Sequence, residues 1–220
     1  MANERSITGI LEFDFRGATA EDFARALLDR PIAESEADKN AMSAGDFDPW
    51  FGHQAEFVQL CTRLFKSFGD LAAPYSLEEI DQALRLISVN PYMLSRLLAQ
   101  PEVPVEDAVA CIRASYHLFA DFASVRAPDD FVGALYMWWD EAWPEEPAFL
   151  AAVLETLERV LALPDLTSRQ AALHGLAHFK QDYDEAAGKA AIDRFINRER
   201  ANLSEDLLAY AELCRDQGHA

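Results

Sequence analysis

Apolar residues recur every three or four positions along most of the chain after Pro49, and this spacing predicts amphipathic helices. Helices of this kind bury their apolar sides against one another, so the pattern predicts an all-α protein. The longest regular stripe follows Pro104. The three clearest stripes are Phe57, Cys61, Leu64 and Phe68; Leu77, Ile80, Leu84 and Ile87; and Val105, Val109, Ile112, Tyr116, Phe119 and Ala123.

Polar caps and prolines divide this pattern into separate helices. Thr19, Ser76 and Ser204 are suitable N-caps, because a hydroxyl accepts a hydrogen bond from a free amide of the first turn. Ser76 and Glu79 have the spacing of a capping box. Prolines stand between the predicted helices, where their missing N–H costs no helical hydrogen bond. We therefore predict a stack of about ten antiparallel helices.

The clearest unit is a helical hairpin over residues 167–200. Thr167 or Ser168 is its expected N-cap, and the run from Gln181 to Asp184 is its expected loop. The first helix carries small residues that would let a neighbouring helix approach closely. These are Ala171, Ala172 and Gly175.

Residues 171–179 line up without gaps on residues 110–118, with His178 against His117, which indicates a repeated helical unit. The chain resembles HEAT/armadillo-type helical repeats and, more closely, a group of uncharacterised bacterial HEAT-like proteins. The likeness extends from Trp50 to the C-terminus. It rests on the runs Tyr136-Met-Trp-Trp-Asp140, Leu173-His-Gly-Leu176 and Ile192-Asp-Arg-Phe195. The resemblance implies a right-handed α-α superhelix, and it implies no activity, substrate or catalytic residue.

The first 48 residues differ from the rest of the chain. Apolar residues alternate over Ile7–Phe15, but no partner strand follows, so we expect an extended N-terminal arm lying on the helical body. Thr19 opens a short helix, and Ala33–Asp48 is a small, polar and acidic loop. We predict one domain over 1–220, with the arm, short helix and loop in 1–48 and stacked helix pairs in 49–220.

Composition narrows the classes of function. Lys and Arg number 19 against 38 for Asp and Glu, and a net charge of −19 repels nucleic acid and anionic membranes. The cysteines, Cys61, Cys111 and Cys214, form no CxxC motif and are typical of reduced thiols. The sequence shows no signal segment and no membrane-spanning run. Together with the cysteine pattern, this predicts a cytoplasmic protein, and we expect no cofactor. The charge favours a basic protein partner, such as a toxin that an immunity protein neutralises.

Four large aromatic residues fall on one side of a helix predicted over Phe131–Trp143. Trp and Tyr concentrate binding energy at interfaces, and they are also the largest core residues, so both interpretations stay open. The first interpretation makes the protein a non-enzymatic protein-interaction module, with the acidic loop Glu34–Asp48 as a second contact. Its candidate partner-binding residues are Tyr136, Trp138, Trp139 and Trp143.

The spacing of His174 and His178 is the pattern that suggests metal chemistry. Residues four apart lie on the same side of a helix, so the two imidazoles can bind zinc or another divalent metal. No Glu follows His174 as in a zinc protease, and the sequence does not identify a ligand on another helix. The alternative is a pair of histidines that hydrogen-bond between stacked helices. A metal-binding protein or metal-dependent enzyme is therefore the second hypothesis for function. Acidic pairs such as Asp140-Glu141 are expected on a solvated face.

Overall fold

The computed structural model describes residues 16–32, 53–88, 94–126, 133–140 and 143–217, and every regular element among them is helical. The prediction of an all-α protein is therefore confirmed for these residues. The expected arm over Ile7–Phe15 and the acidic loop Ala33–Asp48 lie outside them. The elements are α1 (Ala20–Leu28), α3 (Gln54–Lys66), α4 (Phe68–Leu71), α5 (Leu77–Ser88), α6 (Leu94–Leu98), α7 (Val105–Ala114), η3 (Leu118–Ala123), α8 (Ser124–Arg126), α9 (Gly133–Tyr136), η4 (Met137–Trp139), α10 (Pro147–Leu161), α11 (Leu166–Asp182), α12 (Glu185–Glu199) and α13 (Glu205–Asp216).

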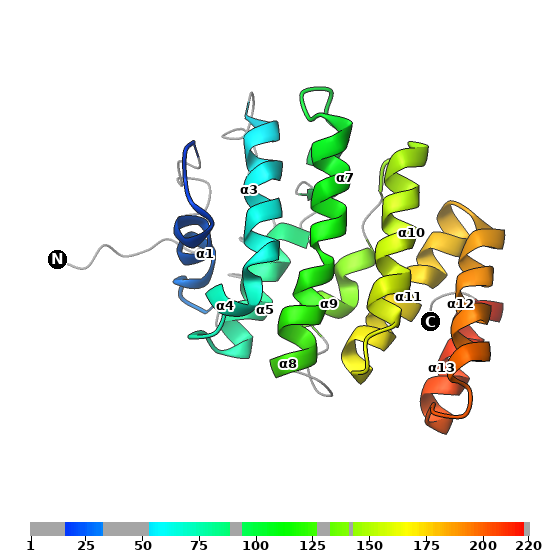
Figure 1. Ribbon diagram of the computed structural model, residues 1–220. Helices are drawn as coiled ribbons and strands as arrows, with labels where there is room; N and C mark the ends of the chain where they lie inside the picture. Colours follow the sequence, from blue (N-terminus) through cyan, green and yellow to red (C-terminus); the bar gives the residue numbers. More distant parts are fainter. Residues whose placement is uncertain (1–15, 33–52, 89–93, 127–132, 141–142, 218–220) are drawn as a thin grey trace.

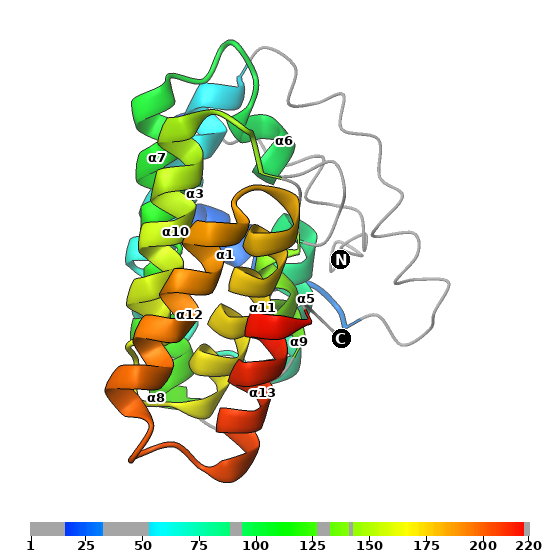
Figure 2. The same cartoon turned by 90° about the vertical axis from the view of Figure 1, so that its right-hand side faces the viewer.

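The long helices form two layers. Helices α3, α7, α10 and α12 stand side by side in one layer (Figure 1), and Figure 2 shows α5, α9, α11 and α13 in the other. Within the first layer α3 packs on α7 and α7 on α10, while α11 packs on α10, α12, α13 and α9. One connected cluster of buried apolar side chains extends from Phe23 in α1 to Cys214 in α13. Through this core α11, which belongs to the second layer, packs on α10 and α12 of the first layer.

Several helices begin where the sequence predicts, because the predicted N-cap side chains make their hydrogen bonds. The Thr19 hydroxyl accepts from the amide of Asp22 at 3.1 Å, and the Ser76 hydroxyl accepts from the amide of Glu79 at 3.3 Å. The Glu79 carboxylate accepts in return from the Ser76 amide at 2.7 Å, which completes the predicted capping box. The Ser204 hydroxyl accepts from the amide of Leu207 and so caps α13.

Two features of the predicted stripes are wrong. Leu77 and Val105 are 36% and 39% exposed, although the spacing places them on apolar faces. Each is the first residue of its helix, where fewer neighbouring turns are available to cover it. The single helix expected after Pro104 ends at Ala114 and gives way to the π-helical η3. The Ser115 hydroxyl donates to the Ile112 carbonyl at 2.7 Å, a contact of the kind that bends helices.

All three cysteines are buried and free, as expected for reduced thiols. Burial raises the pKa of Cys111 to about 12, so this group stays a thiol at neutral pH. None of the described helices combines the length and the apolar composition needed to cross a membrane.

Candidate metal centre

Three side chains from two separate elements converge beside α11: Asp140, His174 and His178. Asp140 Oδ1 lies 2.9 Å from His174 Nε2 and 3.6 Å from His178 Nε2. One ligand atom from each residue can be chosen so that all lie within 4.8 Å of one another. Asp140 Oδ1 is shielded from solvent and accepts no hydrogen bond from the described residues, although both imidazoles are within ion-pair distance. The arrangement brings the predicted histidine pair together with a third potential ligand.

Helix α11 places the two imidazoles on one side. His174 and His178 are one turn apart, and their rings meet edge to face with centroids 4.8 Å apart. The N-cap of this helix is Asp165, whose Oδ1 accepts from the Ser168 amide at 2.8 Å. The prediction of Thr167 or Ser168 as the cap is therefore wrong. The Asp165 carboxylate supplies the acceptor and adds a favourable charge at the helix N-terminus.

The C-terminal end of α11 also differs from the prediction. The loop expected over Gln181–Asp184 is shorter, because the helix continues through Asp182. Asp184 then caps α12 and accepts from the Ala187 amide at 2.9 Å. As a result Asp182 stands one helical turn beyond His178, and its Oδ2 lies 3.7 Å from His178 Nδ1.

Close packing brings Asp140 to this helix. A Cβ added to Gly175 would lie 2.6 Å from Trp139 Cβ and 2.7 Å from Leu157 Cδ2. Gly175 therefore allows η4 to lie directly on α11, as its small size predicts. Asp140 follows Trp139 in the chain and ends η4, so this contact sets the carboxylate beside His174.

Hydrogen bonds fix the chain on both sides of Asp140. Before it, the Ala134 amide at the start of α9 donates to Asp81 Oδ1 of α5 at 2.6 Å. After it, the Trp143 amide donates to the Tyr183 hydroxyl at 2.6 Å, and that hydroxyl lies 3.2 Å from the Trp143 carbonyl. The position of the Asp140 carboxylate is therefore set by contacts with α5 and with two places on α11, Gly175 and the C-cap residue Tyr183.

The aromatic residues form core and site wall, not a surface patch. Trp138, Trp139 and Trp143 are 1%, 2% and 7% exposed, so the core interpretation is correct for them. Trp139 stacks on Phe119, with ring centroids 6.0 Å apart. Within the long helix expected over Phe131–Trp143, the described residues 133–140 instead form the short α9 followed by the 3₁₀ turn η4. Because η4 is not α-helical, the aromatic residues do not all lie on the one side that a helical wheel predicts.

Half-buried Tyr136 borders the cluster. Its ring stacks on His174 with centroids 4.3 Å apart, and its hydroxyl lies 2.8 Å from the Tyr210 hydroxyl of α13. Burial, followed by the contact with Tyr136, raises the pKa of Tyr210 well above its usual range. Tyr210 is therefore a neutral hydrogen-bonding group that links α13 to the wall of the site.

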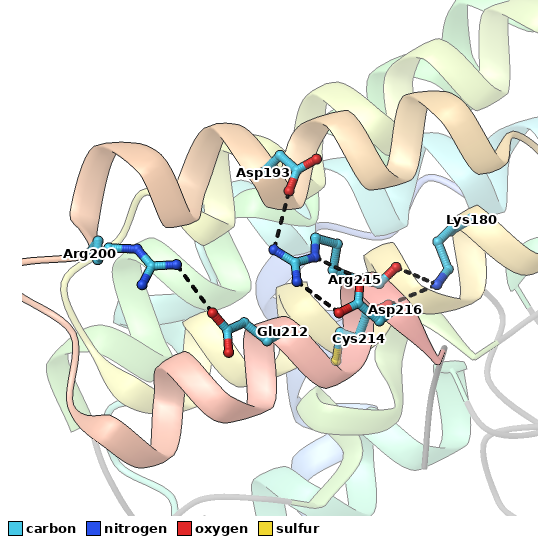
Figure 3. Close-up of polar contacts among 7 residues, drawn as sticks. All are labelled: Lys180, Asp193, Arg200, Glu212, Cys214, Arg215 and Asp216. Atoms are coloured by element: carbon cyan, nitrogen blue, oxygen red, sulfur yellow. Dashed lines mark hydrogen bonds and ion pairs between the residues drawn. The ribbon is translucent and has the colours of Figure 1, made fainter.

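Polar contacts hold α13 against α11 and α12 (Figure 3). Lys180, two residues beyond His178, reaches the last turn of α13 and donates to the carbonyls of Cys214 and Arg215 at 3.0 and 2.8 Å. A cation at this position interacts favourably with the C-terminal end of a helix. Arg215 Nη1 lies 3.6 Å from Asp193 Oδ1 of α12. These contacts keep Tyr210 in place beside Tyr136.

Two of the three distances among the ligand atoms suit a small divalent ion, and the third, between the two histidines, is within 4.8 Å. Around tetrahedral zinc, bonds of about 2.0–2.1 Å place neighbouring ligand atoms about 3.3 Å apart. The distances from Asp140 Oδ1 to the Nε2 atoms of His174 and His178, 2.9 and 3.6 Å, bracket that value. The spacing of the histidines predicts their part of this cluster, whereas the sequence places Asp140 in a solvated acidic pair. No local pattern joins Asp140 to residues that lie more than thirty positions later in the chain.

Comparisons with protein-family models, with curated proteins and with solved structures find no match to this chain. The resemblance to HEAT/armadillo-type repeats stays a prediction.

Proposed function

We propose that this protein binds one divalent transition-metal ion, with zinc as the best fit, through Asp140, His174 and His178. The observation that carries the proposal is the convergence of one carboxylate and two imidazoles from two separate elements. Two nitrogen ligands and one oxygen ligand suit zinc or a similar first-row metal. Magnesium and calcium favour oxygen ligands alone, so they fit this set poorly.

The proposed role is binding, with no reaction assigned. Three protein ligands leave one position of a tetrahedral ion for water or an outside ligand. The side chains of His178 and Asp140 are 17% and 22% exposed, whereas that of His174 is 6% exposed. Solvent therefore reaches parts of the His178 and Asp140 side chains, although Asp140 Oδ1 itself is shielded. An ion at this place would also tie η4 to α11, so its binding free energy would add to the stability of the fold.

A non-enzymatic protein-interaction module is the second proposal. The two-layer order of the helices and the net charge of −19 support a HEAT/armadillo-like right-handed superhelix that binds a basic partner in the cytoplasm. The three buried tryptophans are not part of its surface. The acidic loop Glu34–Asp48 remains the candidate contact segment.

Calorimetric titration with zinc tests the first proposal. Wild-type protein, purified and then stripped of metal, should bind one equivalent with an apparent Kd of about 1 µM or tighter, which corresponds to about 8 kcal/mol. His178→Gln should weaken binding about 100-fold or more, because one of only three protein ligands is lost.

His117→Gln is the matched control. His117 also stands four residues before an aspartate, but no described His, Cys, Asp or Glu completes a three-residue metal group with this pair. The control should bind zinc like wild type. Less than about a tenth of an equivalent bound by wild type, or equal weakening in both variants, would contradict the proposal. The cluster would then be a polar contact between packed elements.

A further inference from the structure

The imidazole of His178 is contacted on both of its nitrogens. Nε2 faces Asp140 Oδ1 at 3.6 Å, while Nδ1 faces Asp182 Oδ2 at 3.7 Å. Asp182 is the last residue of α11, and its side chain is 57% exposed. Its carboxylate therefore approaches the ring from the side opposite the proposed metal.

The two nitrogens of a neutral imidazole have different roles. One carries the proton and the other has the lone pair that binds a metal. A carboxylate near Nδ1 favours the tautomer with the proton on Nδ1, which leaves the Nε2 lone pair free for the ion. Partners of this kind orient the ring and raise its basicity as a ligand.

We infer that Asp182 is a positioning residue for the metal site: its carboxylate holds the His178 proton on Nδ1 and so presents Nε2 to the metal. This inference rests on the proposed function. Metal bound at Nε2 withdraws electron density from the ring and makes the Nδ1–H a stronger donor, so the gap of 3.7 Å should shorten on binding.

The same pairing occurs once more among the described residues, without a metal cluster around it. His117 Nδ1 lies 2.7 Å from Asp121 Oδ2, again with the aspartate four residues later. The His117 and Asp121 side chains are 34% and 50% exposed. The pairing therefore follows from local spacing, and it acquires a function only where His174 and Asp140 are also present.

The test uses Asp182→Ala with two matched controls. Glu185→Ala removes the same charge from a nearby residue on α12, and Asp121→Ala breaks the equivalent pair at His117. Zinc affinity should fall about tenfold in Asp182→Ala, at the low end of the effect of such partners because Asp182 is largely exposed. Both controls should bind like wild type, and Asp182→Glu should recover most of the affinity.

Nitrogen NMR of the metal-free protein in alkaline buffer gives an independent readout. The His178 ring should carry its proton mainly on Nδ1 in wild type and shift toward the Nε2–H form in Asp182→Ala, while Glu185→Ala leaves it unchanged. If Asp182 had only a structural role, the distribution of the His178 proton between Nδ1 and Nε2 would stay the same in Asp182→Ala.

The two proposals fail in different ways. Zinc binding by wild type tests the proposed function, and the difference between Asp182→Ala and Glu185→Ala tests the inference. Equal affinities in these two variants, or the same His178 tautomer in wild type and Asp182→Ala, would overturn the role of Asp182 while leaving the metal site intact. Absence of zinc binding in wild type would overturn both.

Discussion

Residues 110–118 and 171–179 carry similar sequences, and they differ in what surrounds their histidines. Each contains a histidine that pairs through Nδ1 with an aspartate four residues later. His117 Nδ1 lies 2.7 Å from Asp121, and His178 Nδ1 lies 3.7 Å from Asp182. The local pairing is thus shared by the two regions.

The two regions differ in the residue one helical turn before the paired histidine. In the first it is Arg113, which extends outward and pairs with Glu155 of α10 at 2.7 Å. In the second it is His174, which is buried and lies 2.9 Å from Asp140. The next position is Ala114 in the first region and Gly175 in the second, where Trp139 packs against the bare backbone.

This comparison indicates that tertiary packing, more than the helical motif, creates the candidate site. A His-x-x-x-Asp pair forms from local spacing in both places. Only the approach of η4 across Gly175 supplies Asp140. Variants that keep η4 away from Gly175 should therefore remove the difference in zinc binding that we expect between the two regions.

The largest effect is expected from the tryptophan that makes this approach. Trp139→Ala should lower the free energy of unfolding by about 3–5 kcal/mol, because it empties a large volume between Phe119 and Gly175. Urea unfolding measures this. Met137→Ala, two residues earlier and 37% exposed, is the control and should change stability by less than about 1 kcal/mol. Similar stability in the two variants would mean that Trp139 is not a core residue.

A smaller effect is expected from adding a methyl group at Gly175, where η4 packs on α11. Gly175→Ala should cost about 1–3 kcal/mol, because the new methyl group meets Trp139 and Leu157 at 2.6–2.7 Å. Its zinc affinity should also fall, since η4 and Asp140 must move away. Ala114→Gly, at the aligned position, should cost only about 1 kcal/mol of helix propensity and leave zinc binding unchanged. A stable Gly175→Ala with wild-type affinity would rule out the close approach as the cause.

The smallest effect is expected from copying the histidine pair into the first region. Arg113→His creates a second pair of histidines, at 113 and 117, but supplies no counterpart of Asp140. Zinc stoichiometry should therefore stay at one equivalent in calorimetry. Stability should change by less than about 1 kcal/mol, because the Arg113–Glu155 pair is about half exposed. A second tight equivalent would show that the histidine pair alone is sufficient.

The parts of the fold that sequence predicts are those set by neighbouring residues. Thr19 and Ser76 identify helix starts because cap and amide are three positions apart. The histidine pair is predictable for the same reason. In contrast, the break between α9 and η4 and the position of the candidate ligand Asp140 depend on contacts with α5 and α11. The periodicity of the local sequence does not contain these contacts.

The most direct test is a crystal of the wild-type protein grown with zinc and measured at the zinc absorption edge. We expect one anomalous peak bonded to Asp140, His174 Nε2 and His178 Nε2 at about 2.0–2.2 Å. We also expect Asp182 to move within hydrogen-bond distance of His178 Nδ1. Zinc between His117 and Asp121 instead, or no peak beside α11, would contradict the proposed metal site.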